Sequence, residues 1–267
     1  MVVPLNVFIT GASSGIGEAL AREYAQRGAM LGLVARRREP IEALITETHA
    51  YGRAYALDVT KHGALRAAAQ IHLRDYGCPD IVIANAGVSA GTVTEAEEDL
   101  DVFARILNTN VLAVVATFQP FIDAMRARGR GTLVVIASVA GIRGLPGAGA
   151  YSASKAAVMT YAESLRAELR GSGIRVVTIA PGYIDTPMTR GNPYRMPFLM
   201  PVDKFARRAA QTIDQGDAFR IIPWPMSVVA WLLRHVPRGI YDRLASRAPR
   251  KPRVTPSPPS DAATATA

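Results

Sequence analysis

Apolar runs and helical patterns alternate along the chain. Seven runs are short and mostly apolar, without regular alternation with polar residues, which predicts strands buried on both faces. These predicted strands are residues 5–9, 30–35, 53–57, 80–84, 132–137, 175–179 and 219–222. Helical patterns follow the first two strands, and further helices are predicted near residues 61–75, 97–127, 151–170 and 202–215. This order predicts an α/β fold, with a doubly wound parallel sheet and helices on both faces.

Length and composition narrow the class of protein. The chain has 267 residues, 49% hydrophobic and 20% charged, which suffices for one sizeable core. The single cysteine, Cys78, excludes an internal disulfide framework, and the four histidines show no metal-ligand spacing. Residues 1–9 have no basic stretch before the first strand, so we expect no cleavable signal, and the uncharged run 111–122 is too short to span a bilayer. We expect a cytoplasmic protein with one domain over residues 1–248, a disordered tail over 249–267 and no metal site.

Distinctive residues follow six of the predicted strands. They are Thr10-Gly11, Arg36-Arg37, Asp58, Asn85-Ala86-Gly87, Ser138 and Pro181-Gly182. The carboxyl ends of parallel strands lie along one edge of a sheet, where ligands bind. We therefore expect these residues to share one crevice.

A glycine-rich turn connects the first strand to the first helix. Gly11, Gly15 and Gly17 have a spacing one residue longer than the usual dinucleotide fingerprint. Backbone N–H groups and the positive end of the helix can bind a pyrophosphate there. No Lys-Ser or Lys-Thr pair follows the last glycine, so a phosphate loop of the nucleoside-triphosphatase type is not expected.

The end of the second predicted strand indicates which dinucleotide binds. A free ribose 2′-hydroxyl usually meets an acidic residue at this position, whereas a 2′-phosphate needs a cation. Ala35 occupies it and cannot accept a hydrogen bond from ribose, while Arg36 and Arg37 follow. Because an arginine can bind a phosphate with two parallel hydrogen bonds, we expect NADP rather than NAD, with Arg36 more important than Arg37. The alternative interpretation is a solvated basic helix start.

Tyr151 and Lys155 are candidates for acid/base chemistry. They are four residues apart in a predicted helix, which puts the phenol and the ammonium on one face. Lys155 and an oxidised nicotinamide are both cationic, and both would favour the phenolate form of Tyr151. Ser138 follows a predicted strand, so its hydroxyl is expected to face the same crevice.

Taken together, these motifs resemble the classical short-chain dehydrogenase/reductase family over roughly residues 5–190. The resemblance rests on the order and spacing of the glycine turn, Asp58, Asn85-Ala86-Gly87, Asn110, Ser138, Tyr151-x-x-x-Lys155 and Pro181-Gly182. One departure is Ala84, where the family commonly has asparagine. The resemblance implies a single-domain Rossmann fold and a catalytic tetrad of Asn110, Ser138, Tyr151 and Lys155. Within Asn108-Thr109-Asn110 the following Val-Leu-Ala spacing selects the second asparagine.

The resemblance also implies a set of cofactor-binding residues and a reaction. The residues are Gly11, Ser13, Ser14, Gly15, Ile16, Gly17, Arg36, Arg37, Asp58, Val59, Asn85, Ala86, Gly87, Tyr151, Lys155, Pro181, Gly182, Ile184 and Thr186. The implied reaction is NADP(H)-dependent interconversion of a carbonyl and an alcohol, with Tyr151 as general acid/base. Asn110 is expected to order a water in a proton relay. The alternatives are an epimerase or dehydratase on the same fold and a non-catalytic module that senses dinucleotide.

Two further segments bear on substrate and partners. Residues 183–201 contain four prolines and several methionines, so we expect a lid without a long regular helix over a medium to large apolar substrate, with a simple cap on the core as the alternative. Residues 223–247 form an apolar-faced helical segment broken near 237–239, and seven Lys or Arg residues and one Asp lie between Arg234 and Arg253. We expect this segment to close the pocket or an oligomer interface, with peripheral contact to anionic membrane as the alternative. The expected partners are a small-molecule substrate and further copies of the chain, as homodimer or homotetramer, and no nucleic acid.

Overall fold

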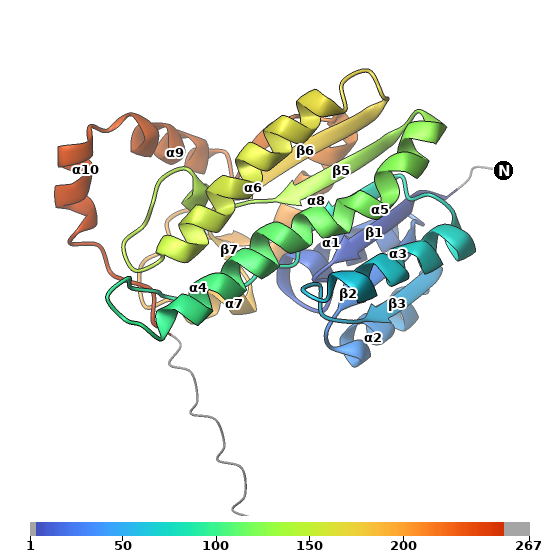
Figure 1. Cartoon of the computed structure of the whole chain (residues 1–267), viewed down its shortest axis with the longest axis horizontal. Coiled ribbons are helices and arrows are strands. Elements are labelled where there is room, and N and C mark those ends of the chain that lie inside the picture. Colours follow the sequence, from blue (N-terminus) through green and yellow to red (C-terminus); the bar gives the residue numbers. More distant parts are fainter. Residues whose placement is uncertain (1–3, 254–267) are drawn as a thin grey trace, which may run out of the picture.

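A computed structural model describes residues 4–253. A seven-stranded sheet forms the centre of the molecule. The strand order is β3-β2-β1-β4-β5-β6-β9, every pairing is parallel, and helices cover both faces (Figure 1). The strands are β1 (Asn6–Thr10), β2 (Met30–Ala35), β3 (Gly52–Ala56), β4 (Ile81–Ala84), β5 (Gly131–Ile136), β6 (Ile174–Pro181) and β9 (Phe219–Ile222). The predicted doubly wound α/β fold is confirmed.

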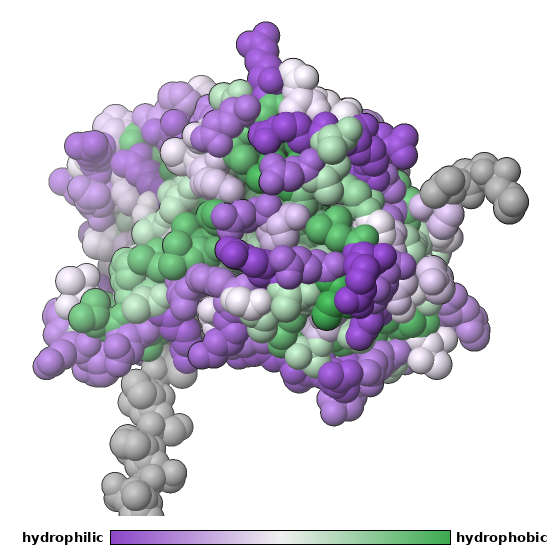
Figure 2. Space-filling view, turned by 45° about the vertical axis from the view of Figure 1, so that its right-hand side comes forward, coloured by the Kyte–Doolittle hydropathy of each residue, from purple (hydrophilic) through white to green (hydrophobic). Residues whose placement is uncertain are grey.

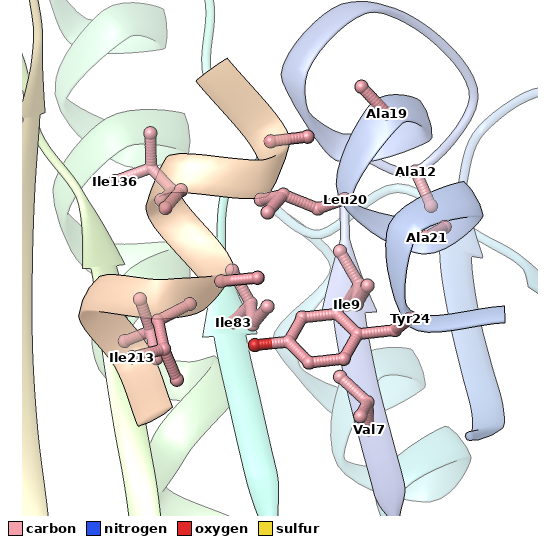
Figure 3. Packing of buried hydrophobic residues seen from close by; sticks show 14 of the residues in the cluster. Val7, Ile9, Ala12, Ala19, Leu20, Ala21, Tyr24, Ile83, Ile136 and Ile213 are labelled. Carbon is pink, nitrogen blue, oxygen red and sulfur yellow. The ribbon is translucent and has the colours of Figure 1, made fainter. Parts of the chain in front are cut away.

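Two apolar layers, one on each face of the sheet, make up the core. On one face α1 (Gly15–Gln26), α2 (Arg38–Thr48) and α8 (Val202–Gln215) pack on the sheet. Figure 3 shows part of this layer, with Tyr24 of α1 lying across Val7 and Ile9 of β1. On the other face α3 (His62–Tyr76), α5 (Ala113–Arg128) and α6 (Gly149–Glu168) pack around Phe8. Successive side chains of β1 thus enter opposite layers, as the pleat of a strand requires.

The order of the strands places a crevice between β1 and β4. From β1 the chain proceeds outward through β2 to β3, then returns to pair β4 with the other side of β1 and continues to β5, β6 and β9. The connections on either side of this point diverge, and ligands bind outside the carboxyl ends of the strands there. The residues that the sequence singled out as following these strands all lie at this edge.

The predicted helix over residues 97–127 is interrupted. It consists of α4 (Asp99–Leu107), a π-helical turn η1 (Asn108–Leu112) and α5. Such wider turns occur often at functional sites. Within residues 4–253 the continuous stretch Asp99–Arg128 is long and apolar enough to cross a membrane by length and composition alone. That is weak evidence, because a core helix passes the same test, and Phe118 and Phe121 of this helix are fully buried against the sheet.

The proline-rich segment over residues 183–201 contains no long helix, as predicted. It forms β7 (Ile184–Asp185), the single turn α7 (Pro187–Arg190) and β8 (Met200–Pro201). The strands β7 and β8 pair with each other in a separate two-stranded sheet. The pairing of β7 with β8 therefore brings the two ends of the segment together, just after the carboxyl end of β6.

The last helices extend away from the sheet. They are α9 (Pro225–His235) and α10 (Arg238–Ala245), and the break between them falls where it was predicted (Figure 1). Met226 is buried against Gly182, but large apolar side chains on both helices are half exposed or more, namely Trp224, Val228, Trp231, Leu232, Ile240 and Leu244. Most of the apolar face therefore does not close over the pocket. The sequence from residue 254 onward lies outside the described residues.

Candidate active site

A cavity of about 950 Å³ lies at the carboxyl edge of the sheet. Its lining brings together most of the predicted site residues: Gly11, Ser13, Ser14, Gly15, Ile16, Arg36, Asp58, Val59, Asn85, Ala86, Gly87, Ser138, Tyr151, Lys155, Pro181, Gly182, Ile184 and Thr186. Three other predicted site residues, Gly17, Arg37 and Asn110, are not part of this lining but contact residues that are. The cavity therefore joins the glycine turn to the Tyr151–Lys155 pair in one space.

The glycine turn fits a pyrophosphate. Gly11 and Gly15 have φ angles of +71° and +60°, in the left-handed region that favours glycine. A Cβ on Gly17 would lie 2.2 Å from the carbonyl oxygen of Gly11, so α1 packs directly against the turn. Ser14 precedes α1 without a side-chain cap, which leaves the first N–H groups of the helix for an anionic ligand.

Three consecutive arginines after β2 have different surroundings. Arg37 donates to the carbonyl oxygen of Ser13 at 3.1 Å and so braces the glycine turn, and Arg38 pairs with Glu42 at 3.0 Å. Arg36 lines the cavity, and its side chain makes no hydrogen bond or ion pair with any residue in 4–253. This distribution leaves one guanidinium at the position where a ribose 2′-phosphate would bind.

Asp58 lines the cavity after β3, and two hydrogen bonds from Thr60 favour its carboxylate form. It accepts the Thr60 backbone N–H at 2.9 Å and the Thr60 hydroxyl at 2.8 Å. The backbone hydrogen bond is the largest cause that lowers the pKa of Asp58, and the charge of Arg36 contributes as well. Asp58 is the one acidic residue in the lining.

Asn85 ties the ends of β1 and β4 together. Its side-chain amide donates to the carbonyl oxygens of Thr10 at 3.0 Å and of Gly11 at 3.2 Å. The hydroxyl of Thr10 accepts the backbone N–H groups of Asn85 and Ala86 at 3.2 and 3.3 Å. These bonds fix the floor of the cavity at the point where the strand order diverges.

Asn110 is a fully buried residue of the π-helical turn η1. Its carbonyl oxygen accepts the Val88 N–H at 2.8 Å, and its amide donates to the Val88 carbonyl oxygen and the Ser154 hydroxyl, both at 3.0 Å. The side chain thus connects the segment after β4 to α6. The residue is engaged in these three bonds and is not part of the cavity lining.

Tyr151 and Lys155 lie on one face of α6, opposite Ser138 at the end of β5. The ammonium of Lys155 is 5.8 Å from the centre of the Tyr151 ring and donates to the Ile136 carbonyl oxygen at 2.9 Å. Ser138 accepts the Ala140 N–H at 3.1 Å, which fixes its side chain. A Cβ on Gly141 would lie 2.6 Å from the Lys155 carbonyl carbon, so this loop packs against the backbone of α6.

Burial dominates the ionisation of this pair. It raises the pKa of Tyr151 above its ordinary value of 10, although the hydrogen-bonding influence of Ser138 acts in the opposite direction. It also lowers the pKa of Lys155 to about 8. The protein without cofactor therefore does not by itself favour the phenolate form of Tyr151, and the expected shift would also need the positive charge of an oxidised nicotinamide. Burial thus favours the neutral phenol of Tyr151, the form that can donate a proton.

Residues 249–253, which we call the strap, were expected to be part of a disordered tail, yet they lie along the cavity. Lys251 and Pro252 line it, and the Pro252 carbonyl oxygen accepts the Gly91 N–H at 3.0 Å. Arg253 binds both carboxylate oxygens of the buried Asp99, at 2.9 and 3.1 Å, and also Glu98 at 2.7 Å. Sequence reasoning missed this segment, because a basic run among prolines has no periodicity. It also missed Arg105, which lines the cavity from α4.

Comparisons with known proteins agree with this geometry. The family model described as short chain dehydrogenase matches residues 5–195. An uncharacterised oxidoreductase of Myxococcus xanthus is 38% identical over 245 residues, which cover 91% of this chain and 96% of that protein. A short-chain dehydrogenase from Sphingobium yanoikuyae, solved in complex with NADPH, is 30% identical with a TM-score of 0.74, covering 92% and 97% of the two chains.

An alcohol dehydrogenase from Thermococcus sibiricus, solved with 5-hydroxy-NADP, is 27% identical with a TM-score of 0.72, covering 82% of this chain and 96% of the other. A 3-oxoacyl-[acyl-carrier-protein] reductase of Thermotoga maritima is 36% identical over 190 residues, or 69% and 76% of the two chains. The matched range contains the glycine turn, Ser138, Tyr151 and Lys155 in the order and geometry described above. This chain is a member of the short-chain dehydrogenase/reductase family of oxidoreductases.

Proposed function

We propose that this protein is an NADPH-dependent reductase that converts a carbonyl into an alcohol. The observation that carries this proposal is the juxtaposition of Tyr151, Lys155 and Ser138 in the cavity that also contains the glycine turn and Arg36. When bound, NADPH supplies a hydride to the carbonyl carbon. The cradle at Gly11 and Gly17, with the uncapped N-terminus of α1, fits its pyrophosphate.

The chain's own residues supply the proton and the electrostatic support. The Tyr151 hydroxyl donates its proton to the carbonyl oxygen as the C–O bond becomes single. The Ser138 hydroxyl donates a hydrogen bond to the same oxygen, and the Lys155 ammonium stabilises the phenolate left on Tyr151. Positioned proton transfer of this kind contributes typically about 10² to 10⁴ in rate. Burial raises the pKa of Tyr151, and this favours the protonated phenol that donates in the reductive step.

Stoichiometry separates this function from its alternatives. A reductase oxidises one NADPH for each alcohol formed. An epimerase or dehydratase leaves the cofactor unconsumed over complete cycles, and a sensor binds NADPH without turnover. The test is a spectrophotometric assay of NADPH and NADH with a panel of aldehydes and ketones, with the alcohol product quantified by chromatography. NADPH binding without consumption by any carbonyl compound would contradict the proposal.

The reaction should depend on pH through Lys155. Its ammonium is present below a pKa of about 8 and is lost as the pH rises through that value. We expect kcat/KM for NADPH, at saturating carbonyl, to be level near neutral pH and to fall above about pH 8, because this parameter reports the free enzyme. Lys155→Arg retains the charge, so the fall should disappear in that variant, at a lower absolute rate. A wild-type profile that stays level to pH 10 would contradict this assignment.

The apolar surfaces suit a second copy of the chain or a membrane. Figure 2 shows hydrophobic residues gathered between hydrophilic margins on one face, and Leu100 and Leu112 are among the exposed large side chains.

The α9–α10 segment combines exposed tryptophans with basic residues such as Arg234, Arg238 and Arg243. We propose that it associates with copies of the chain. If so, the protein should show no salt-sensitive binding to anionic vesicles in a flotation assay. Salt-sensitive binding of the wild-type protein that is lost in the Trp231→Glu variant would instead identify a membrane contact.

A further inference from the structure

A second ammonium group lies beside Tyr151. Lys251 of the strap is 6.0 Å from the centre of the Tyr151 ring, nearly the same distance as Lys155 at 5.8 Å. The two lysines reach the ring from different elements, since Lys155 is on α6 and Lys251 comes from the strap. Lys155 is bonded to the Ile136 carbonyl oxygen at the end of β5, whereas Lys251 is bonded to Ser89 after β4. The phenol thus has one cation from the catalytic helix and another from the strap.

The strap holds Lys251 in a defined position. The double hydrogen bond between Arg253 and the buried carboxylate of Asp99 anchors one side. A Cβ on Gly91 would lie 2.3 Å from the Lys251 carbonyl oxygen, so the two backbones are in direct contact. On the other side, the Arg250 side chain lies against Gly147, where a Cβ would be 2.9 Å from it. These contacts fix the backbone on both sides of Lys251, so its side chain is held at one place in the cavity wall.

No carboxylate of the protein neutralises Lys251 within residues 4–253. Its one side-chain hydrogen bond there is to the Ser89 hydroxyl at 2.8 Å, and no acidic oxygen lies within ion-pair distance. The cavity lining contains four basic residues, Arg36, Arg105, Lys155 and Lys251, against Asp58 alone. Arg36 is at the dinucleotide end, whereas Lys251 is beside the reacting phenol. A partly buried ammonium with a neutral partner is stabilised when an anion approaches it.

We propose that Lys251 binds a carboxylate of the substrate, so that the enzyme reduces oxo acids in which the carboxylate is a few bonds from the reacting carbonyl. Ser89 accepts a hydrogen bond from Lys251 and keeps its own O–H to donate, so the two side chains can serve both oxygens of a carboxylate. Burial lowers the pKa of Lys251, and a bound carboxylate would offset that effect. The inference rests on the proposed reductase function and specifies its substrate class. An apolar body on the substrate is compatible with Ile184 and Met188 in the lining.

The test compares each acid with its uncharged methyl ester. Benzoylformate, benzoylacetate and benzoylpropionate place the carboxylate at increasing distance from the ketone, and each ester has nearly the same shape without the charge. We expect wild-type kcat/KM to favour at least one acid over its ester by about 10- to 100-fold, the range of a hydrogen bond to a charged group. Lys251→Met should reduce that ratio toward one, and Lys251→Arg should retain most of it. Arg247→Gln, which removes one positive charge from an exposed position outside the cavity, is the matched control and should leave the ratio unchanged.

The outcomes separate this inference from the function on which it rests. If Lys251 only orders the strap, acid and ester turnover fall together in Lys251→Met and the ratio stays, which would overturn the inference. A wild-type enzyme without preference for any acid over its ester would also overturn it, even while acetophenone and other uncharged ketones are reduced. If no ketone at all consumes NADPH, the proposed reductase function has failed and the inference with it. Fluorescence titration with NADPH checks that each variant is folded and binds cofactor.

Discussion

Tyr151→Phe is expected to reduce kcat for carbonyl reduction by about 10² to 10⁴, while the dissociation constant for NADPH changes by only a few-fold. The substitution removes one oxygen atom, the group that carries the transferable proton. The phenyl ring keeps its place between Lys155 and Lys251, so the cavity retains its shape. Single-turnover measurements on the preformed NADPH complex would report the loss in the chemical step directly.

A matched control lies on the same helix. Tyr161 of α6 is partly buried against the core layer on this face of the sheet and does not line the cavity. Tyr161→Phe likewise removes a phenolic oxygen. We expect it to leave kcat close to the wild-type value. Turnover of Tyr151→Phe within a few-fold of wild type would show that another group donates the proton, and Tyr151 would then lose its assignment as the acid.

Arg36→Ala is expected to lower the preference for NADPH over NADH by about 10- to 100-fold. Arg36 lines the cavity at the end of β2, where Ala35 offers no acceptor for a ribose hydroxyl. A charge-assisted contact with the 2′-phosphate would act on NADPH alone, so kcat/KM for NADH should change little.

The neighbouring arginines provide the comparison for this experiment. Arg38 pairs with Glu42, so Arg38→Ala should leave the ratio of the two cofactors unchanged. Arg37 braces Ser13 in the glycine turn, so Arg37→Ala should weaken both cofactors to a similar extent. An unchanged ratio in Arg36→Ala would remove Arg36 from the phosphate site, and a changed ratio in Arg37→Ala would place Arg37 there instead.

The strands and the glycine turn could be predicted from the sequence because they depend on local patterns. The apolar runs that became β1 and β2 differ by at most one residue from their predicted bounds, since a strand covered on both faces needs continuous hydrophobicity. Tyr151 and Lys155 share a face simply because of helical spacing. Asn110 was assigned by resemblance, but its bonds to Val88 and Ser154 depend on the π-helical turn, which the apolar pattern does not reveal.

Features formed between distant segments escaped prediction. The pairing of Arg253 with Asp99 joins residues 154 positions apart, and no local pattern in a basic, proline-containing stretch indicates it. Likewise, the ionisation of Tyr151 could not be derived from its neighbours in the sequence. The expected phenolate depends on the charges of Lys155 and of a bound oxidised nicotinamide, whereas in the protein without cofactor burial raises the pKa of Tyr151, and burial is a property of the folded chain.

The anchoring of the strap has a consequence for how the enzyme is made. β1, β2 and the glycine turn are synthesised before Lys251 and Arg253, which lie far downstream in the sequence. A domain generally folds as a unit, and the strap packs on Asp99 and Gly91 of the same domain. The wall of the cavity beside the phenol therefore forms only after residues 249–253 have been synthesised. A chain that terminates before residue 249 would contain the glycine turn and the Tyr151–Lys155 pair but lack the part of the wall that holds Lys251.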